Sequence, residues 1–437
     1  MNKEEILKLI DEEDVEFIRL QFSDAFGNLK NIAVTPERFE KVLDNLYPFD
    51  GEGFFDGLYQ FEEDLYLCPN LDTFVILPWR PQQSRVGKFI CDICYSDGRP
   101  FELSPRYILE KVVKKAKEKG YTFVVNPECE FFLFHTDENG APTTITHEKA
   151  GYLDVGPYDL GENARRDMVL MLQEMGFSIE ASHHEKAPAQ HEISFSEGEA
   201  FKTADDIMTF KFAIRSIAKR FGLYATFMPK PLQDAAGSGM HLDISAYKDG
   251  VNIFDGAKGM SEDAKYFIGG IMKYAPMMCA ITNPIVNSYK RLVPGYEAPV
   301  YIAWSGINRS PLIRIPASRG NGTRVELRCA DPAANPYLAL AVCLRAGLDG
   351  IVNHIEPPKS VDRNIYEMTE AERKMLGIGS LPDTLTEAVA EMEADPFIAD
   401  VLGEHVFQKY TEAKREEWNR YRSQVTEWEI NEYLNKI

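Results

Sequence analysis

Two acidic residues inside one long apolar strand constrain the fold of this chain more than any other feature. The run Thr122–Phe134 is predicted to be a β-strand in which Glu128 and Glu130 point to the same face, while apolar side chains occupy the opposite face. An apolar strand of this kind is typical of the centre of a sheet, where unpaired carboxylates are costly. We therefore expect cations to neutralise the two acids, either bound metal ions or the partners of structural salt bridges.

The surrounding pattern mixes strands and helices without a regular βαβ order, which indicates an α+β fold. The N-terminal hundred residues are predicted to be rich in strands, whereas the rest carries longer helices. We expect helices at residues 3–12, 105–119, 161–176, 203–221 and through most of 365–437, a hairpin over 15–34, and strands at 190–195 and 240–247. A length of 437 residues suits two domains, which we place at residues 1–102 and 103–437.

Composition argues against several classes of protein. The chain has 48 basic and 68 acidic residues, and its net charge of −20 disfavours binding to nucleic acid or to an anionic membrane. No apolar run approaches the roughly 20 residues that span a bilayer, and the charged N-terminus does not resemble a signal peptide. Only Cys91 and Cys94 of the seven cysteines have metal-like spacing, so we expect reduced thiols in a cytoplasmic protein rather than a zinc site.

Three further segments carry residues of the same chemistry. Glu185 and Glu192 flank a loop, His241 follows a glycine-rich run, and Glu326 lies between arginines on a short strand. Each has a simpler explanation: a solvated loop, a structural histidine, or an edge strand facing water. Taken together, hard carboxylates with few thiolates favour Mg²⁺ or Mn²⁺. The nearby arginines suit phosphate or carboxylate groups, so we expect a phosphoryl-transfer or ligase site without a Walker loop.

Several long motifs identify a family. The segments are GENARRD, EASHHEKAPAQHEI, FMPKP, GSGMH, NSYKRLVPGYEAPVYIAWSGINRSPLIRIPASRG and RVELRCADPAANPYLAL. Together they resemble glutamine synthetase of the bacterial class I type, in the Gram-positive-like subgroup, over essentially the whole chain. The resemblance implies a small N-terminal β-grasp domain and a larger catalytic domain with a curved antiparallel sheet flanked by helices. It also implies a double-ring homo-dodecamer with active sites between neighbouring subunits, and regulatory proteins are further candidate partners.

The resemblance also implies roles for individual residues. One metal ion would be held by Glu130, Glu185 and Glu192, and the second by Glu128, His241 and Glu326. The residues implied for ATP are Glu180, Ser245, Arg309, Arg314 and Arg324, and those for glutamate are Gly237, Arg291, Glu297 and Arg328. Glu297 would also close the site and take a proton from ammonium, with Tyr152 and a neighbouring subunit's Asp50 as its partners, while Arg309 would assist catalysis.

The implied reaction is ATP-dependent ligation of ammonia to L-glutamate through γ-glutamyl phosphate. An alternative is a γ-glutamyl-amine ligase on the same scaffold, and a third reading is a non-catalytic regulatory or structural assembly. Four positions depart from the family pattern: Glu52-Gly53 in the ammonium-site motif, Ala236 before GSGMH, Tyr59 in place of a feedback-linked arginine, and residues 364–368, which lack an adenylylation tyrosine motif. The first two bear on the nucleophile and on glutamate affinity, and the last argues against control by adenylylation.

Overall fold

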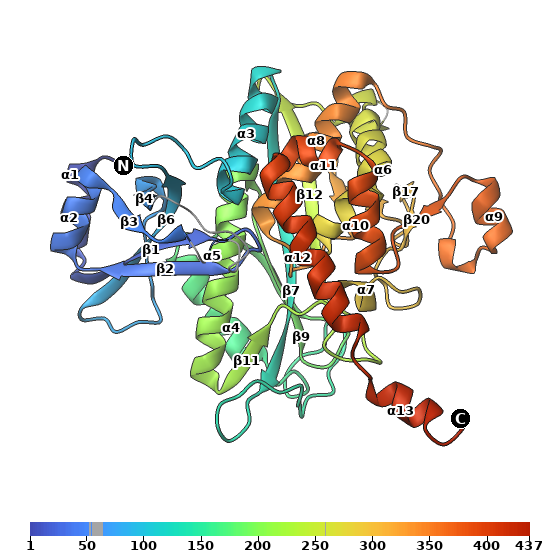
Figure 1. Ribbon diagram of the computed structural model, residues 1–437, viewed down its shortest axis with the longest axis horizontal. Coiled ribbons are helices and arrows are strands. Elements are labelled where there is room, and N and C mark those ends of the chain that lie inside the picture. The colour runs from blue at the N-terminus through green and yellow to red at the C-terminus, as the bar shows by residue number, and fades with distance from the viewer. Residues whose placement is uncertain (52–53, 55–63, 258) are drawn as a thin grey trace.

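The computed structural model describes residues 1–51, 54, 64–257 and 259–437. It places a small N-terminal sheet beside a larger body that is built on a second sheet (Figure 1). The predictions at Glu52, Gly53 and Tyr59 lie outside the described residues. Within the described part of the chain, no helix combines the length and apolar character needed to cross a membrane.

The N-terminal sheet has six strands in the order β2-β1-β6-β4-β3, with β5 paired to β6. Its strands are β1 (Val15–Ser23), β2 (Leu29–Val34), β3 (Tyr47–Phe49), β4 (Leu65–Pro69), β5 (Val75–Ile76) and β6 (Arg85–Cys94). The hairpin predicted over residues 15–34 is confirmed as β1 and β2. Helices α1 (Lys3–Glu12) and α2 (Pro36–Asn45) pack here, and Phe39 of α2 stacks on Phe89 with ring centroids 4.7 Å apart.

The larger sheet has ten strands, and β7 (Thr122–His135) lies at its centre. The order is β17-β18-β19-β12-β7-β9-β8, while β10 and β11 pair with β7 and β13 pairs with β12. The bounds are β8 (Ile179–His184), β9 (Gln190–Phe195), β10 (Gly198–Glu199), β11 (Leu223–Thr226), β12 (Met240–Lys248), β13 (Val251–Asn252), β17 (Trp304–Ser305), β18 (Ile313–Arg314) and β19 (Val325–Leu327). The predicted antiparallel arrangement is confirmed, with one parallel pair, β17 and β18, at the edge.

Two short ribbons and eleven further helices complete the body in the described part of the chain. The ribbons pair β14 (Asp255–Gly256) with β15 (Gly259–Met260), and β16 (Tyr301–Ile302) with β20 (Gly379–Ser380). The helices are α3 (Pro105–Glu118), α4 (Glu162–Glu174), α5 (Ala200–Ala218), α6 (Glu262–Thr282), α7 (Ser288–Arg291), α8 (Pro336–Asn353), α9 (Glu370–Met375), α10 (Leu385–Ala394), α11 (Phe397–Leu402), α12 (Glu404–Arg422) and α13 (Glu427–Tyr433). The helices predicted at 105–119, 161–176 and 203–221 are confirmed as α3, α4 and α5.

A buried ion pair joins the first helix of the larger body to its neighbours. The guanidinium of Arg106 in α3 donates to both carboxylate oxygens of Asp205 in α5, at 2.9 and 2.8 Å, and also contacts Asp92 of β6. Burying a charge is costly unless it is paired, so these contacts fix α3 between the two sheets. The N-terminal sheet is therefore held at a defined place beside the larger one.

Candidate active site

A cavity of about 790 Å³ opens over the central strands of the larger sheet. The predicted residues that line it are Glu128, Glu130, Tyr152, Glu185, Glu192, His241, Glu297, Arg309, Arg314, Glu326 and Arg328. Because β19, β12, β7 and β9 are consecutive strands of the sheet, acids that are far apart in sequence meet on one face. The structure thus brings all the predicted metal ligands together with residues predicted to contact phosphate and ammonium.

Strand register places the first group of ligand candidates. His241 of β12 lies directly opposite Glu128 of β7, and its Nδ1 is 3.2 Å from Oε2 of Glu128. The same nitrogen is 3.7 Å from Oε1 of Glu326, on the neighbouring strand β19. One ligand atom from each of these residues lies within 4.8 Å of the others, a separation that allows all three to bind one ion.

A second group lies on β8 and β9. Glu192 is opposite His183 in the β8–β9 pair, and Nε2 of His183 is 2.8 Å from Oε1 of Glu185, so these three residues also lie within 4.8 Å of one another. Glu130 of β7 lies opposite Glu192 of β9. Its Oε2 accepts hydrogen bonds from the backbone amide of Gly239 and from Nε2 of Gln190, each at 2.9 Å. His183 is an addition to the predicted set, and ligation by Glu130 stays a prediction.

Neighbouring cations do not neutralise every acid in this cavity. Burial, followed by repulsion from Glu128 and Glu130, raises the pKa of Glu192 well above its ordinary value, and burial also raises the pKa of Glu130. Glu128 behaves differently: burial opposes its ionisation, but its hydrogen bond with His241 and the nearby arginines hold its pKa below the ordinary value. A divalent cation would relieve the repulsion at Glu192, and the oxygen-rich donor set fits Mg²⁺ or Mn²⁺.

Three arginines, Arg309, Arg314 and Arg328, line the same cavity. Arg314 donates a hydrogen bond from Nη1 to Oε2 of Glu326 at 2.8 Å, and Arg328 donates from Nε to Oε1 of the same carboxylate at 3.0 Å. Arg309 lies on a loop, and its own backbone carbonyl accepts a hydrogen bond from Nη1 of Arg328. These guanidinium groups could bind phosphate or carboxylate oxygens next to the metal candidates.

A smaller cavity of about 40 Å³ adjoins the main one and contains the residues predicted to bind glutamate. Gly237, Arg291, Glu297 and Arg328 line it, as does Ala236. The glycine-rich run permits this packing, because a methyl group at Gly239 would lie only 2.7 Å from Nη2 of Arg291 and 2.9 Å from Nε2 of His241. The buried Arg291 donates to the carbonyl of Cys329 at 2.7 Å, which fixes its position.

Four predicted residues are not among the described residues that line either cavity. Glu180 is exposed on β8, Ser245 is buried on β12, and Arg324 pairs with Asp243 through Nε and Oδ2 at 2.7 Å. Asp50 follows β3 in the N-terminal sheet. Their roles at the nucleotide and in the ammonium pocket stay predictions.

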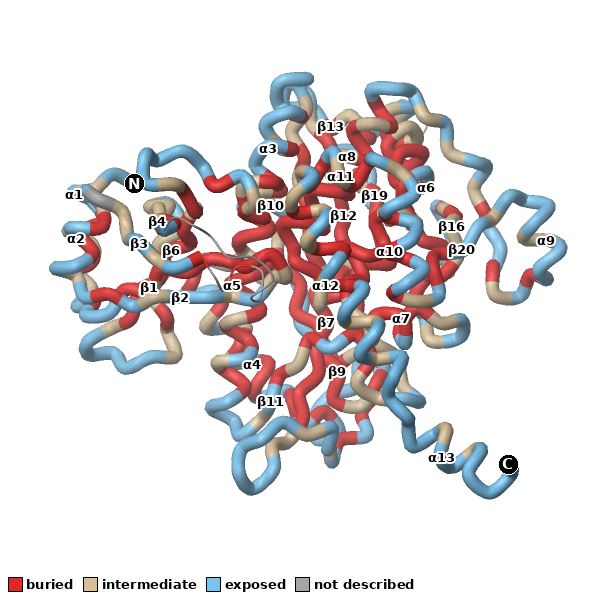
Figure 2. Tube along the Cα trace, in the orientation of Figure 1, coloured by how far each residue is buried: buried red, intermediate tan, exposed pale blue. Residues whose placement is uncertain are grey.

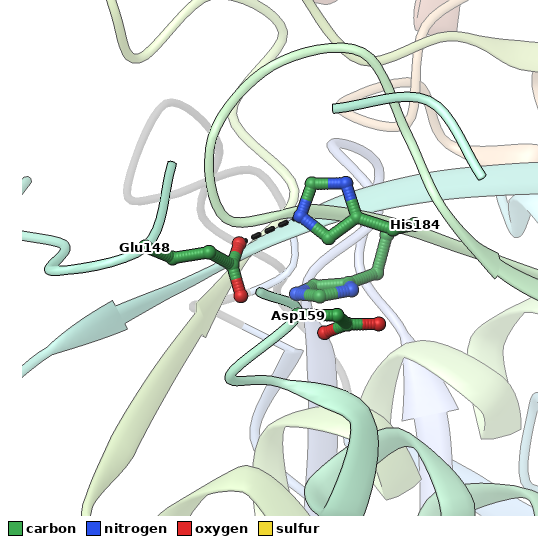
Figure 3. A group of neighbouring side chains, drawn as sticks. Glu148, Asp159 and His184 are labelled. Carbon is green, nitrogen blue, oxygen red and sulfur yellow. Dashed lines mark hydrogen bonds and ion pairs between the residues drawn. The ribbon is translucent and has the colours of Figure 1, made fainter. Parts of the chain in front are cut away.

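A second acidic cluster, which the sequence analysis did not indicate, lies on the other side of β8 and β9. We call Glu148, Asp159, Arg165, His184 and His191 the buried cluster. Figure 3 shows Glu148 directed at His184, with 2.7 Å between Oε1 and Nε2. The same carboxylate accepts hydrogen bonds from three backbone amides, of Ala189, Leu160 and Gly161, at 2.6, 2.7 and 3.1 Å. Although burial opposes ionisation, these bonds and the histidines lower the pKa of Glu148 to about 2.

Arg165 neutralises the rest of the buried cluster. Its Nη1 donates to Oδ2 of Asp159 at 2.7 Å and to Nδ1 of His191 at 2.8 Å. Burial and the adjacent guanidinium lower the pKa of His191 to about 3, so this imidazole is neutral. Two buried atoms, Nε2 of His191 and Oδ1 of Asp159, have no hydrogen-bond partner among the described residues. The cluster joins the loop that carries Tyr152 to the strands that carry the ligand candidates.

Comparisons with known proteins agree with this geometry. Family models described as "Glutamine synthetase, beta-Grasp domain" and "Glutamine synthetase, catalytic domain" match residues 14–96 and 102–433. A glutamine synthetase of Clostridium saccharobutylicum is 57% identical over 438 residues and 99% of both chains. One from Staphylococcus aureus (strain Mu50 / ATCC 700699) is 51% identical over 439 residues, 99% of this chain and 98% of that one.

A solved structure described as "GmaS/ADP complex-Conformation 1" superposes with a TM-score of 0.89 at 32% identity, covering 98% of this chain and 99% of that one. A second structure, described as "Apo GmaS without ligand", gives a TM-score of 0.88 at the same identity. Motifs, paired domains and full-length relatives therefore lead to one assignment: this chain is a member of the glutamine synthetase family.

Proposed function

We propose that this protein ligates ammonia to L-glutamate with ATP, giving L-glutamine, ADP and phosphate through γ-glutamyl phosphate. The observation that carries the proposal is the cavity in which two groups of carboxylates and imidazoles lie beside three arginines. Relatives named glutamine synthetase, 57% and 51% identical over 99% of this chain, support the reaction. A solved relative described as an ADP complex supports nucleotide binding.

The ligand candidates fit two divalent cations. Glu128, His241 and Glu326 would hold one Mg²⁺ or Mn²⁺ ion. Glu130, Glu185 and Glu192, which line the same cavity, would hold the other. Bound there, such ions supply positive charge that stabilises a phosphoryl group during its transfer. All of these side chains are retained, which argues against a non-catalytic assembly, since buried acids without a ligand are costly.

The arginines and the small cavity position the substrates. Arg309, Arg314 and Arg324 contact the phosphates of ATP, while Glu180 and Ser245 lie on the nucleotide side. Arg291 and Arg328 bind the carboxylates of glutamate, and the backbone of Gly237 receives its amino group. Fixing both substrates in this way converts their encounter into an intramolecular step.

The nucleophile binds where Glu297 and Tyr152 face the cavity, together with Asp50 of the partner subunit. Carboxylates attract ammonium by charge, and Glu297 then takes its proton so that ammonia can attack the acyl phosphate. Because water would hydrolyse that intermediate, closure of residues 293–298 over the cavity protects it.

A homo-dodecamer of two rings is the assembly we propose, with domains at residues 1–102 and 103–437. Asp50 lies in the N-terminal sheet and does not line the cavity of its own chain, which supports sites shared between subunits. Helix α13 extends from the body (Figure 2). Trp428 in this helix and Leu434 just after it are 62% and 73% exposed, which supports contact with another subunit. The seven free cysteines support a reducing compartment such as the cytoplasm, where regulatory proteins are further candidate partners.

The test is glutamine formation and phosphate release by purified protein with Mg²⁺, ATP and glutamate, with ammonium or a panel of amines. We expect ammonium to drive turnover and Glu297→Ala to lower kcat by about 10²- to 10⁴-fold, as loss of a general base does. Turnover with an amine but not with ammonium would instead establish the γ-glutamyl-amine ligase reaction on the same fold.

A further inference from the structure

Lys186 reaches into the cavity from the turn between β8 and β9, beside the ligand candidate Glu185. Its Nζ forms an ion pair with Oε1 of Glu297, on the loop that closes the opposite side. Both residues line the main cavity, and the two side chains are 46% and 53% exposed. The contact therefore joins two walls of the cavity at its solvent side.

The ammonium group of Lys186 has a second neighbour in the same cavity. Its Nζ lies 5.8 Å from the centroid of the Tyr152 ring, within the range of a cation–π interaction. The edge-to-face contact between Tyr152 and His183, with centroids 5.7 Å apart, holds that ring in place. A cation beside a carboxylate and near an aromatic face is the environment in which a small ammonium ion would bind.

The loop that carries Glu297 is constrained where this contact forms. Glu297 has a φ of 71°, a left-handed conformation that is unfavourable for a residue with a side chain. The preceding Tyr296 is held from the other side, because Nζ of Lys230 lies 3.6 Å from the centroid of its ring. These features accompany the position of the Glu297 carboxylate beside Lys186 in this structure.

From these contacts we propose that Lys186 is a specificity-determining residue whose side-chain ammonium competes with the nucleophile for Glu297. This inference rests on the proposed function, in which Glu297 and Tyr152 receive ammonium. A lysine head group and an ammonium ion carry the same charge and both donate N–H hydrogen bonds, so one carboxylate oxygen cannot serve both fully. Lys186 consequently weakens the binding of ammonium, and of cationic amines that need the same space.

The experiment compares the KM for ammonium in the wild-type protein and in Lys186→Met, which removes the charge and keeps an unbranched side chain. We expect the variant's KM for ammonium to be about two- to fivefold lower, because exposed ion pairs contribute free energies of that size. The KM for ATP stays unchanged, because the residues assigned to its phosphates do not pair with Lys186. Lys117→Met is a matched control, since the Lys117–Glu199 pair is 48% and 56% exposed and lies outside the cavity lining.

Lys186→Arg separates charge from shape. Arginine keeps the cation, so its KM for ammonium should equal or exceed that of the wild type. An unchanged or higher KM in Lys186→Met, or a lower KM in both variants, overturns the inference. If the wild-type protein makes no glutamine from ammonium, the proposed function fails instead, so the two failures are distinguishable.

Discussion

The two faces of the β8–β9 strand pair carry similar side chains in different electrostatic surroundings. His183 lies opposite Glu192 and faces the open cavity, whereas the next pair, His184 and His191, belongs to the buried cluster. On both faces, carboxylate and imidazole atoms lie within 4.8 Å of one another. Proximity of such groups therefore does not by itself identify a metal site.

The difference lies in the supply of counter-charge. In the buried cluster, Arg165 and backbone amides bind the carboxylates, and the pKa of Glu148 is lowered to about 2. In the cavity, Glu128 and Glu326 have His241 and arginines as counter-charges, but burial and repulsion from Glu128 and Glu130 raise the pKa of Glu192. A cluster whose charges are balanced within the chain can be purely structural, whereas a buried acid without counter-charge either stays protonated or is neutralised by a cation from outside.

The largest effect that we expect is a loss of activity when an acid of the cavity is substituted. Glu192→Gln removes one candidate ligand and should lower kcat by about 10³-fold, equivalent to about 4 kcal/mol, because metal ions stabilise the charge of phosphoryl transfer. Stability should respond in the opposite sense. In the presence of a chelator, the free energy of unfolding should be unchanged or higher, since the substitution removes repulsion with Glu128 and Glu130.

Steady-state kinetics and urea unfolding of the two proteins provide the measurements. A variant that loses activity and also unfolds more easily without metal would contradict the comparison, because it would mean that the Glu192 carboxylate stabilises the fold.

A Glu→Gln substitution in the buried cluster should lower the free energy of unfolding, in contrast to Glu192→Gln. Glu148→Gln should lower the free energy of unfolding at pH 7 by about 3 kcal/mol, since a pKa near 2 in place of 4.5 represents stabilisation of that size. The buried carboxylate contributes fully above its unfolded pKa of 4.5, and its contribution is lost as the pH falls towards 2. Urea midpoints measured from pH 7 downwards should therefore decline less steeply in the variant.

Glu138→Gln, in an exposed loop, is the matched control and should leave the profile unchanged. If Glu148→Gln unfolds with the wild-type pH dependence, the buried cluster does not neutralise its acid as described.

The sequence was sufficient to predict that acids gather on the face of the sheet that lines the cavity, because Glu128 and Glu130 lie on a strand with a clear alternation. Glu128 and Glu130 alternate with apolar residues on β7, and the glycine-rich run marks the approach to His241. Resemblance to a family then assigned these and the other ligand candidates to two metal ions. Period-two patterns and long motifs are local properties, so a single sequence can reveal them.

The buried cluster could not be predicted in this way. Glu148 and Asp159 come from an irregular segment, and only tertiary packing brings that segment to His184 and His191. Helices α6 and α8 were also missed, because both are largely apolar around their circumference and lack an amphipathic period. Which of the paired histidines faces the cavity depends on strand register, which the local pattern does not fix.

The smallest predicted effect tests packing rather than charge in the buried cluster. A methyl group at Gly161 would lie 2.5 Å from both Cε1 and Nε2 of His191, yet its φ of −83° is ordinary, so Gly161→Ala introduces a clash without backbone strain. We expect it to lower the free energy of unfolding by about 2 kcal/mol, as overpacking of a buried site does. Gly306→Ala, where a methyl group meets open space, should change it by less than about 1 kcal/mol.

Because His191 is followed by Glu192, the Gly161 variant should also weaken Mg²⁺ binding, measured by calorimetry. Loss of stability with unchanged Mg²⁺ affinity would show that the two faces of the strand pair act independently.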